Sequence, residues 1–324
     1  MRVSVFIIFL SLVFTNAFSQ IRNEDKDRIR ISQNKILKSI QWTHKYVQGK
    51  ANPNGYITTE TNYDKKGNPV EVVNYKSTGI ISSKLNYKYD QNNNKIEFIQ
   101  YQKLNKPDLE VAFKQAFQYD NNGNKKIEVG FDGATGYTIN YSYLSDNKPK
   151  DIIKYNSSRV IIEKWEYSYS DNIQTINIFK MDKLDRSIIR KFDTKGNITE
   201  EVNKNSAGKE LQKTTNDYNS ENLLTSSSEY FSGKLVKKLV YKYNTDNQIT
   251  EITQINPDNS KTLNRSNSYD NQGNLIEEKW FDGIPDDLSS RKFKYDKKSN
   301  VIEVETYYSD YKYKVLYKFN YEYY

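Results

Sequence analysis

Hydrophobic and polar residues alternate with a period of two along most of this chain. Val70-Glu71-Val72 and Ile302-Glu303-Val304 are two examples. This alternation is typical of β-strands with one face in water. Upstream, residues 40–46 and 56–63 show the same pattern, and residues 48–55, with their Pro and Gly, are expected to form a loop.

The alternating segments recur at a fixed spacing, each after an aromatic residue that precedes an Asp/Asn-rich turn. Successive gaps between these anchor residues range from 23 to 30, with 26 the commonest. Phe319-Asn320 is expected to begin an eleventh, incomplete unit. The ten anchor residues are Tyr63, Tyr89, Tyr119, Tyr143, Tyr169, Phe192, Tyr218, Tyr243, Tyr269 and Tyr295.

Two further columns keep register with the anchor residues. Eight residues on, the side chain is acidic in seven of ten units, as in Glu71 and Glu251. Twelve residues on, it is apolar or aromatic in nine of ten, as in Tyr75 and Phe281. Lys88, Lys242 and Lys294 stand where they are expected to pair with the acidic column across neighbouring strands.

The turns suit hairpins. Segments 64–68, 120–124 and 270–274 place Asp and Asn where they bond the local backbone and Gly where a positive φ is needed. Two strands of roughly eight to ten residues and two turns fill a unit. A single hairpin is marginal in water, so we expect the units to pair edge to edge and bury their aromatic columns.

Composition supports a folded but polar protein. Apolar residues make up 36% of 324, and mean hydropathy is −0.90, yet 28 Tyr, 14 Phe and 3 Trp supply aromatic surface that disordered chains lack. The net charge of +8 comes from interleaved signs, which indicates a solvated surface. Nucleic acid is therefore not an expected partner.

The first 19 residues are predicted to be an export signal. A basic start is followed by the apolar run 3–14 and by Ala17-Phe18-Ser19, with small residues at the cleavage positions. The mature chain is expected to begin at Gln20, with a polar leader over 20–35, a β-hairpin repeat domain over 36–324 and no transmembrane segment. The absence of cysteine excludes disulfides and thiol chemistry.

The motif Tyr-Asp-x-x-Gly-Asn followed by a β-branched strand, as in residues 63–68, 119–124 and 269–274, resembles the YD repeats of the RHS family. The resemblance covers residues 56–324, with degenerate units at Tyr143-Leu144 and Tyr218-Asn219. It implies strips of antiparallel hairpins in an exported or surface protein. The period is longer than the usual YD repeat, and no toxin segment follows.

No catalytic, cofactor or metal site is predicted. His44, the only histidine, is expected to be an ordinary strand residue, because no nucleophile motif accompanies it. The acidic column indicates a solvated face rather than the single carboxyl pair of a glycosidase. Residues 90–94 and 120–124 begin like calcium loops, but Tyr101 and Phe131 stand where the bidentate acid is needed.

The sequence thus predicts an all-β, elongated, curved antiparallel sheet of about ten tandem hairpins of about 26 residues. The expected role is a non-enzymatic binding or structural surface, exported to the periplasm, outer surface or medium, with a glycan or an envelope protein as partner. Two alternatives stay open. One is a glycan-active enzyme. The other is an outer-membrane β-barrel, opposed by Glu163 between Ile161 and Trp165 and by Lys237 between Leu235 and Leu239.

Overall fold

The computed structural model describes residues 26–103, 108–131, 133–284 and 286–324. The predicted signal segment lies outside these residues. Residues 26–33 of the predicted leader form a helix. The strands are β1 (Ile36–Val47), β2 (Lys50–Ala51), β3 (Tyr56–Tyr63), β4 (Pro69–Tyr75), β5 (Ile81–Tyr89), β6 (Lys95–Gln102), β7 (Glu110–Tyr119), β8 (Lys125–Phe131), β9 (Gly136–Tyr143), β10 (Pro149–Asn156), β11 (Ile161–Ser170), β12 (Ile173–Lys180), β13 (Lys183–Phe192), β14 (Ile198–Asn205), β15 (Glu210–Tyr218), β16 (Leu224–Phe231), β17 (Lys234–Tyr243), β18 (Ile249–Ile255), β19 (Lys261–Tyr269), β20 (Leu275–Trp280), β21 (Ser289–Tyr295), β22 (Val301–Tyr308) and β23 (Tyr313–Tyr323).

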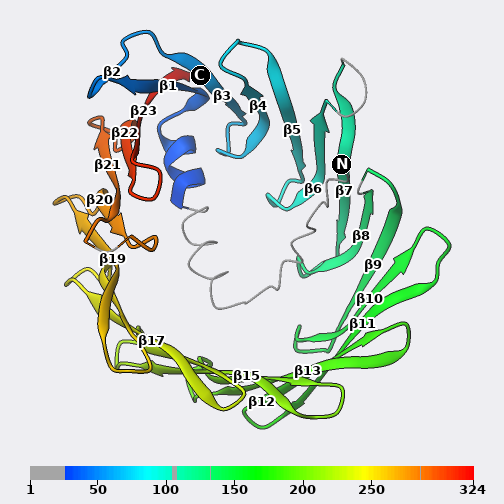
Figure 1. Cartoon of the computed structure of the whole chain (residues 1–324). Helices are drawn as coiled ribbons and strands as arrows, with labels where there is room; N and C mark the ends of the chain where they lie inside the picture. Colours follow the sequence, from blue (N-terminus) through cyan, green and yellow to red (C-terminus); the bar gives the residue numbers. More distant parts are fainter. Residues whose placement is uncertain (1–25, 104–107, 132, 285) are drawn as a thin grey trace, which may run out of the picture.

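The sheet is closed, and the predicted open, elongated sheet is wrong. Each strand from β3 onward pairs antiparallel with the next, and β1 pairs with both β3 and β23. Within the described residues, β1 and β3–β23 make a ring of 22 strands (Figure 1), while the short β2 pairs only with β1. An even number is required, because antiparallel strands alternate in direction around a closed ring.

The physical reason for closure lies in repeated β-bulges. The register shifts by one residue at the anchor residue in nine of the ten anchored hairpins, for example between Asn62 and Tyr63 and between Lys242 and Tyr243. The strand register also shifts beside many turns at the opposite rim, for example between Asn74 and Tyr75. Bulges bend and twist the strands that carry them. Repeated in almost every unit, this bending brings the last strand back to the first.

The turns have the predicted chemistry. The Asp64 carboxylate accepts the backbone N–H groups of Lys66 and Asn68, each at 2.9 Å, and Gly67 has a φ of +84°. A hydrogen bond then links this turn to the next one, because the Asn68 amide donates to the Asn93 side-chain oxygen at 3.1 Å. Turns at this rim are therefore tied to one another as well as to their own strands.

The helix of residues 26–33 bridges the seam where the ring closes. Ser32 Oγ donates to the Lys65 carbonyl at 2.8 Å, on the turn between β3 and β4. On the other side of the seam, the Arg30 guanidinium donates to Asn300 Oδ1 at 3.1 Å. The helix packs closely against the turn between β3 and β4, because a Cβ on Gly67 of that turn would lie 2.0 Å from the Arg28 carbonyl oxygen.

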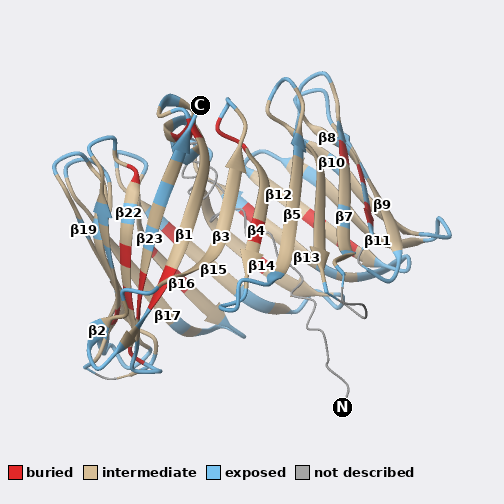
Figure 2. Ribbon diagram, turned by 90° about the horizontal axis from the view of Figure 1, so that it is seen from above, coloured by how far each residue is buried: buried red, intermediate tan, exposed pale blue. Residues whose placement is uncertain are grey.

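The wall is a single layer with little conventional core. Ten hydrophobic residues are buried among those described, and most others are half-buried (Figure 2). With strands about 4.8 Å apart and tilted by about 40°, a ring of this size is about 40 Å across. Barrels of 16 or more strands are too wide for wall side chains to fill. The described wall therefore surrounds a lumen.

Candidate functional site: the lumen wall

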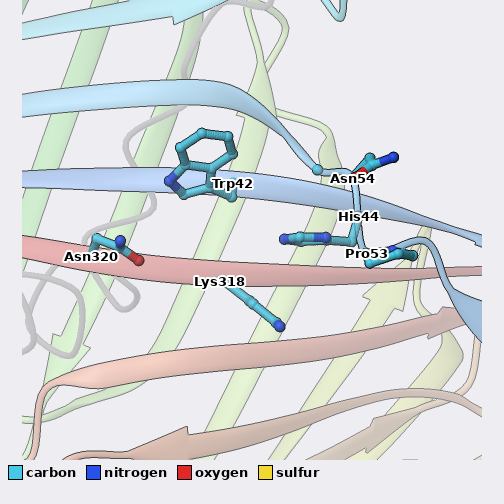
Figure 3. Close-up of a pocket in the computed structure, with 7 residues that line it drawn as sticks. Trp42, His44, Pro53, Asn54, Lys318 and Asn320 are labelled. Atoms are coloured by element: carbon cyan, nitrogen blue, oxygen red, sulfur yellow. The ribbon is translucent and has the colours of Figure 1, made fainter.

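The two faces of the wall can be assigned from the register. In Figure 3, the strands of the opposite side of the ring lie behind the wall, so the view is from outside the barrel. The Trp42 and Lys318 side chains lie in front of the wall and are therefore on its outer face. The anchor residues are on the lumen face, where the helix lies within the ring (Figure 1) and Arg30 bonds the Tyr321 hydroxyl. Residues paired in register share a face, which extends the assignment around the barrel.

The predicted aromatic columns lie on opposite faces. Anchor Tyr89 pairs with Lys95 on the lumen face, whereas Lys88 pairs with Glu97 and Lys84 pairs with Tyr101 on the outer face. In nine of the ten anchored hairpins, a bulge beside the turn adds one residue and so reverses the alternation. The prediction that the two columns bury one another is therefore wrong, and each column packs with different neighbours.

The anchor tyrosines form a hydrogen-bonded ladder around the lumen. The Tyr243 hydroxyl donates to the Leu224 carbonyl at 2.7 Å, and Tyr269 donates to the Ile249 carbonyl at 2.9 Å. Tyr321 continues the ladder to the Val301 carbonyl, so Tyr321, 26 residues after Tyr295, takes the role expected of Phe319. Eight tyrosines donate in this way, at 2.6 to 3.2 Å: Tyr119, Tyr143, Tyr169, Tyr218, Tyr243, Tyr269, Tyr295 and Tyr321.

This ladder predicts loss of stability at high pH. Burial, with smaller contributions from nearby charged groups, raises the pKa of Tyr243, of Tyr295 and of Tyr321 to about 12 in the folded protein. Below pH 10, tyrosines are protonated in both states and the full stability is present. Between about pH 10 and 12 the unfolded chain loses these protons first, so the free energy of unfolding falls as pH rises.

The check is an absorbance titration of tyrosinate together with melting temperatures from pH 9 to 12. We expect part of the 28 tyrosines to ionise only as the protein unfolds. Complete ionisation near pH 10 in the still-folded protein would contradict the ladder.

Nine residues after the anchor, the lumen face carries a column that the sequence analysis missed. Most units have an apolar residue there, such as Ile152 or Ile252, but three have glutamate: Glu128, Glu201 and Glu278. Each glutamate binds a cation. Glu201 accepts from Arg190 at 2.7 Å, and Glu278 lies 3.0 Å from Arg265. A glutamate at a position that is apolar in most other repeats was the signal in the sequence that could have identified these residues.

Glu128 is the centre of the most enclosed of these groups. It is 6% exposed and accepts hydrogen bonds from Gln115 at 2.8 Å and from the Tyr137 and Tyr141 hydroxyls at 3.1 Å. Burial and the Glu128 carboxylate raise the pKa of Tyr141. Gly130 makes the arrangement possible, because a Cβ there would lie 2.0 Å from the Tyr137 ring.

Aromatic rings and lysines share the rest of the lumen face. The Lys95 ammonium lies 5.7 Å from the centre of the Tyr87 ring, and Lys154 lies 4.7 Å from that of Tyr137. The Tyr87 and Phe98 rings are 5.1 Å apart. The Lys95 side chain is exposed, and the other four are half-buried. They therefore present cationic and aromatic surface to the lumen.

Basic residues outnumber acidic ones on the lumen face. The register places twelve basic residues there: Lys45, Lys95, Lys125, Lys154, Lys180, Lys183, Arg186, Arg190, Lys234, Lys237, Arg265 and Arg291. It places six acidic residues there: Glu110, Glu128, Glu163, Glu201, Glu229 and Glu278. Asp185, the bulge residue of β13, adds a seventh, because it lies 3.1 Å from Lys180. The difference, twelve minus seven, gives this face of the ring five excess positive charges.

Glu163 and Lys237, the two charges that opposed a barrel in the sequence, therefore lie on the lumen face. There they do not interrupt an outer surface. Glu163 accepts the Trp165 indole N–H at 2.7 Å, and Lys237 lies 3.2 Å from Glu229. The alternation in the sequence shows which residues share a face of the sheet. It does not show which of the two faces lines the lumen.

The acidic column lies on the outer face and has the predicted lysine partners. Lys88, Lys242 and Lys294 lie 2.7, 2.7 and 2.6 Å from Glu97, Glu251 and Glu303. Hydrogen bonds from Lys88 and Lys242 lower the pKa of Glu97 and of Glu251. Glu97, Glu251 and Glu303 are therefore ion-paired carboxylates on the outer face.

The remaining predicted positions serve local structure. His44 is buried on the outer face, and its Nδ1 lies 2.8 Å from the Asn52 carbonyl oxygen. The Asp90 and Asp120 carboxylates accept backbone N–H groups of their own turns. No group of His, Asp and Glu among the described residues is arranged to hold a metal ion. No helix in the described part of the chain is long and apolar enough to cross a membrane.

Comparisons with known proteins give only distant structural likenesses. Neither protein-family models nor curated proteins match this chain. Among solved structures, the Tc holotoxin pore of Photorhabdus luminescens is 12% identical with a TM-score of 0.27, covering 83% of this chain and 19% of that one. The TcdB2-TccC3 crystal structure is 10% identical with a TM-score of 0.31, covering 84% and 19%.

A porin-like protein from Bacteroides uniformis is 11% identical with a TM-score of 0.29, covering 89% of this chain and 97% of that one. This chain spans about a fifth of the length of the toxin chains. Likenesses this distant carry no argument about activity, ligand or location. The similarity to YD repeats therefore rests on the sequence motif and the tandem hairpins.

Proposed function

We propose that this protein is an exported, non-enzymatic barrel that binds an acidic polypeptide segment in its lumen. The observation that carries the proposal is the difference between the two faces of the wall. Outside, lysines pair with the glutamates of the acidic column. Inside, aromatic and aliphatic side chains stand half-exposed beside five excess positive charges. Such a surface suits a guest with carboxylates and apolar side chains.

Aliphatic residues favour polypeptide over glycan as the lumen guest. Ile152, Ile252 and Leu239 lie between the aromatic residues of the lumen face and are only half-buried. Sugars stack on flat aromatic rings, whereas branched aliphatic side chains pack with other apolar side chains. The absence of a catalytic role is part of the proposal, because the carboxylates described above are held in ion pairs or hydrogen bonds.

The test is binding of the mature chain, residues 20–324, to a random copolymer of glutamate and tyrosine. Polylysine and neutral dextran serve as comparison ligands. We expect the acidic copolymer to bind and its affinity to fall with added salt, because lysines on the wall contact its carboxylates. Polylysine and dextran should not bind.

Charge reversal on each face locates the binding site. Lys95→Glu with Lys154→Glu, on the lumen face, should weaken binding at least tenfold. Lys238→Glu with Lys261→Glu makes the same charge change on the outer face and should leave binding within about twofold. Equal losses in the two double variants would show that the copolymer binds the outside, and the lumen proposal would fail.

An outer-membrane barrel is the second candidate, because closure with an even number of antiparallel strands is also the architecture of that class. The outer face opposes it. Lys114, Lys164 and Lys238 lie on outer positions in the middle of their strands. A lysine facing lipid at mid-membrane costs about 2–4 kcal/mol. We therefore expect the mature protein to stay soluble without detergent; recovery only in the outer-membrane fraction would favour this candidate.

A further inference from the structure

The seam of the barrel carries a groove on its outer face. It has a volume of about 410 Å³ and is lined by Trp42 and His44 of β1, by residues 53–55, and by Lys318 and Asn320 of β23 (Figure 3). Its two sides come from opposite ends of the chain, so the groove exists only because the sheet closes. Its volume is in the range of small-ligand sites.

The loop over the groove is held in place by His44. The imidazole Nδ1 lies 2.8 Å from the Asn52 carbonyl oxygen, and the ring packs directly against Gly55. A Cβ at Gly55 would lie 2.5 Å from the His44 ring. The loop of residues 53–55 therefore packs against β1 so closely that only glycine fits at position 55. This contact gives the groove a defined edge.

The groove also interrupts the pattern of the outer face. Trp42 is the only tryptophan there, since Trp165 and Trp280 are on the lumen face. Lys318 is in register with Glu303, but Glu303 binds Lys294 at 2.6 Å. Among the ion pairs of the described residues, none includes Lys318, whose side chain is exposed. An indole and an ammonium group that is in none of these ion pairs thus lie on paired strands, and the Lys318 side chain extends away from Trp42 (Figure 3).

We propose that this groove binds a carboxylate-bearing sugar, such as a uronic acid unit of an acidic glycan. The C–H face of one pyranose ring packs on the Trp42 indole, and a carboxylate of the same glycan binds the Lys318 ammonium group. The exposed amides of Asn54 and Asn320, at opposite ends of the groove (Figure 3), hydrogen-bond the hydroxyls of neighbouring sugar units. A neutral sugar could stack but would gain no charge interaction. The site is separate from the lumen, so the two proposals can succeed or fail independently.

The experiment is calorimetric titration of the mature chain with trigalacturonic acid and with a neutral galactose trimer. We expect the acidic trimer to bind at least tenfold more tightly than the neutral one. Lys318→Ala should remove that preference, because it deletes the only charge that the proposal assigns to recognition. Lys242→Ala, a lysine of the same face away from the groove, is the matched control and should change affinity less than twofold.

Trp42→Ala should abolish binding of both trimers, provided that its circular dichroism and melting temperature show a folded barrel. If that variant does not fold, Lys318→Ala decides alone, since its side chain is exposed. Equal affinity for acidic and neutral trimers, no binding at millimolar concentration, or equal effects of Lys318→Ala and Lys242→Ala would each overturn the proposal.

Discussion

A disulfide across the seam is expected to form spontaneously and to stabilise the protein by up to about 5 kcal/mol. The double variant is Gln41→Cys with Phe319→Cys, two positions that face each other between β1 and β23. Directly opposed residues of antiparallel strands have Cα atoms about 4.5 to 5.5 Å apart, which a disulfide can span. The natural chain has no cysteine, so no other pairing competes.

The size of the effect follows from the length of the loop that the bond closes. Nearly the whole repeat domain lies between residues 41 and 319, and the entropy removed from the unfolded chain grows with the logarithm of loop length. Strain in the native state would lower the gain. Oxidised and reduced samples should be compared by denaturant unfolding, with thiol counting to confirm the bond.

The control is Gln41→Cys with Gln212→Cys, which places the second cysteine on β15, on the other side of the ring. This pair should stay reduced in the folded monomer. If the seam pair also stayed reduced under oxidising conditions, or formed only dimers, the ends of the sheet would not meet and the closed barrel would be refuted.

Removing one aromatic ring of the tyrosine ladder is expected to lower the free energy of unfolding by about 3 kcal/mol. Tyr243→Ala deletes a half-buried ring and its hydrogen bond to the Leu224 carbonyl. Large-to-small changes at aromatic positions cost about 3 to 5 kcal/mol when the ring is fully buried, so the lower end applies. Tyr243→Phe keeps the ring and should cost about 1 kcal/mol, the usual contribution of one hydrogen bond.

Lys242→Ala is the matched control, because Lys242 is the neighbouring residue and points to the outer face. It loses an exposed ion pair with Glu251, which contributes about 0 to 1 kcal/mol. Urea unfolding of the three variants checks the order of effects. If Tyr243→Ala were no more destabilised than Lys242→Ala, the anchor residues would not hold the wall together.

Local features of the fold were predictable because neighbouring residues determine them. The Asp-x-x-Gly-Asn turns form as expected, since the Asp64 carboxylate and Gly67 meet the needs of the turn on their own. The lysine partners of the acidic column were also predictable, because cross-strand pairing follows from hairpin register. The polar leader shows no periodicity in the sequence, and its helix of residues 26–33 is stabilised by contacts with turns that are distant in the chain.

The lumen face was predictable only in part. The anchor tyrosines were predictable from the sequence, but the three glutamates of the lumen face were not, because they stand one residue after the acidic column. The bulge found beside nine of the ten anchored turns is not marked by any residue type, and it decides which of two adjacent columns faces inward. Glu128 and Glu97 therefore appear alike in sequence, although they lie on opposite faces.

The sequence by itself determined that this protein consists of tandem antiparallel hairpins, with a spacing near 26 residues and polar, paired strands. Only the tertiary structure decided that the sheet closes, which face lines the lumen, and that Trp42 and Lys318 line one groove at the seam. The physical reason is that hairpins depend on interactions within one repeat. Closure depends on the sum of small bends over 22 strands, and no single repeat encodes that sum.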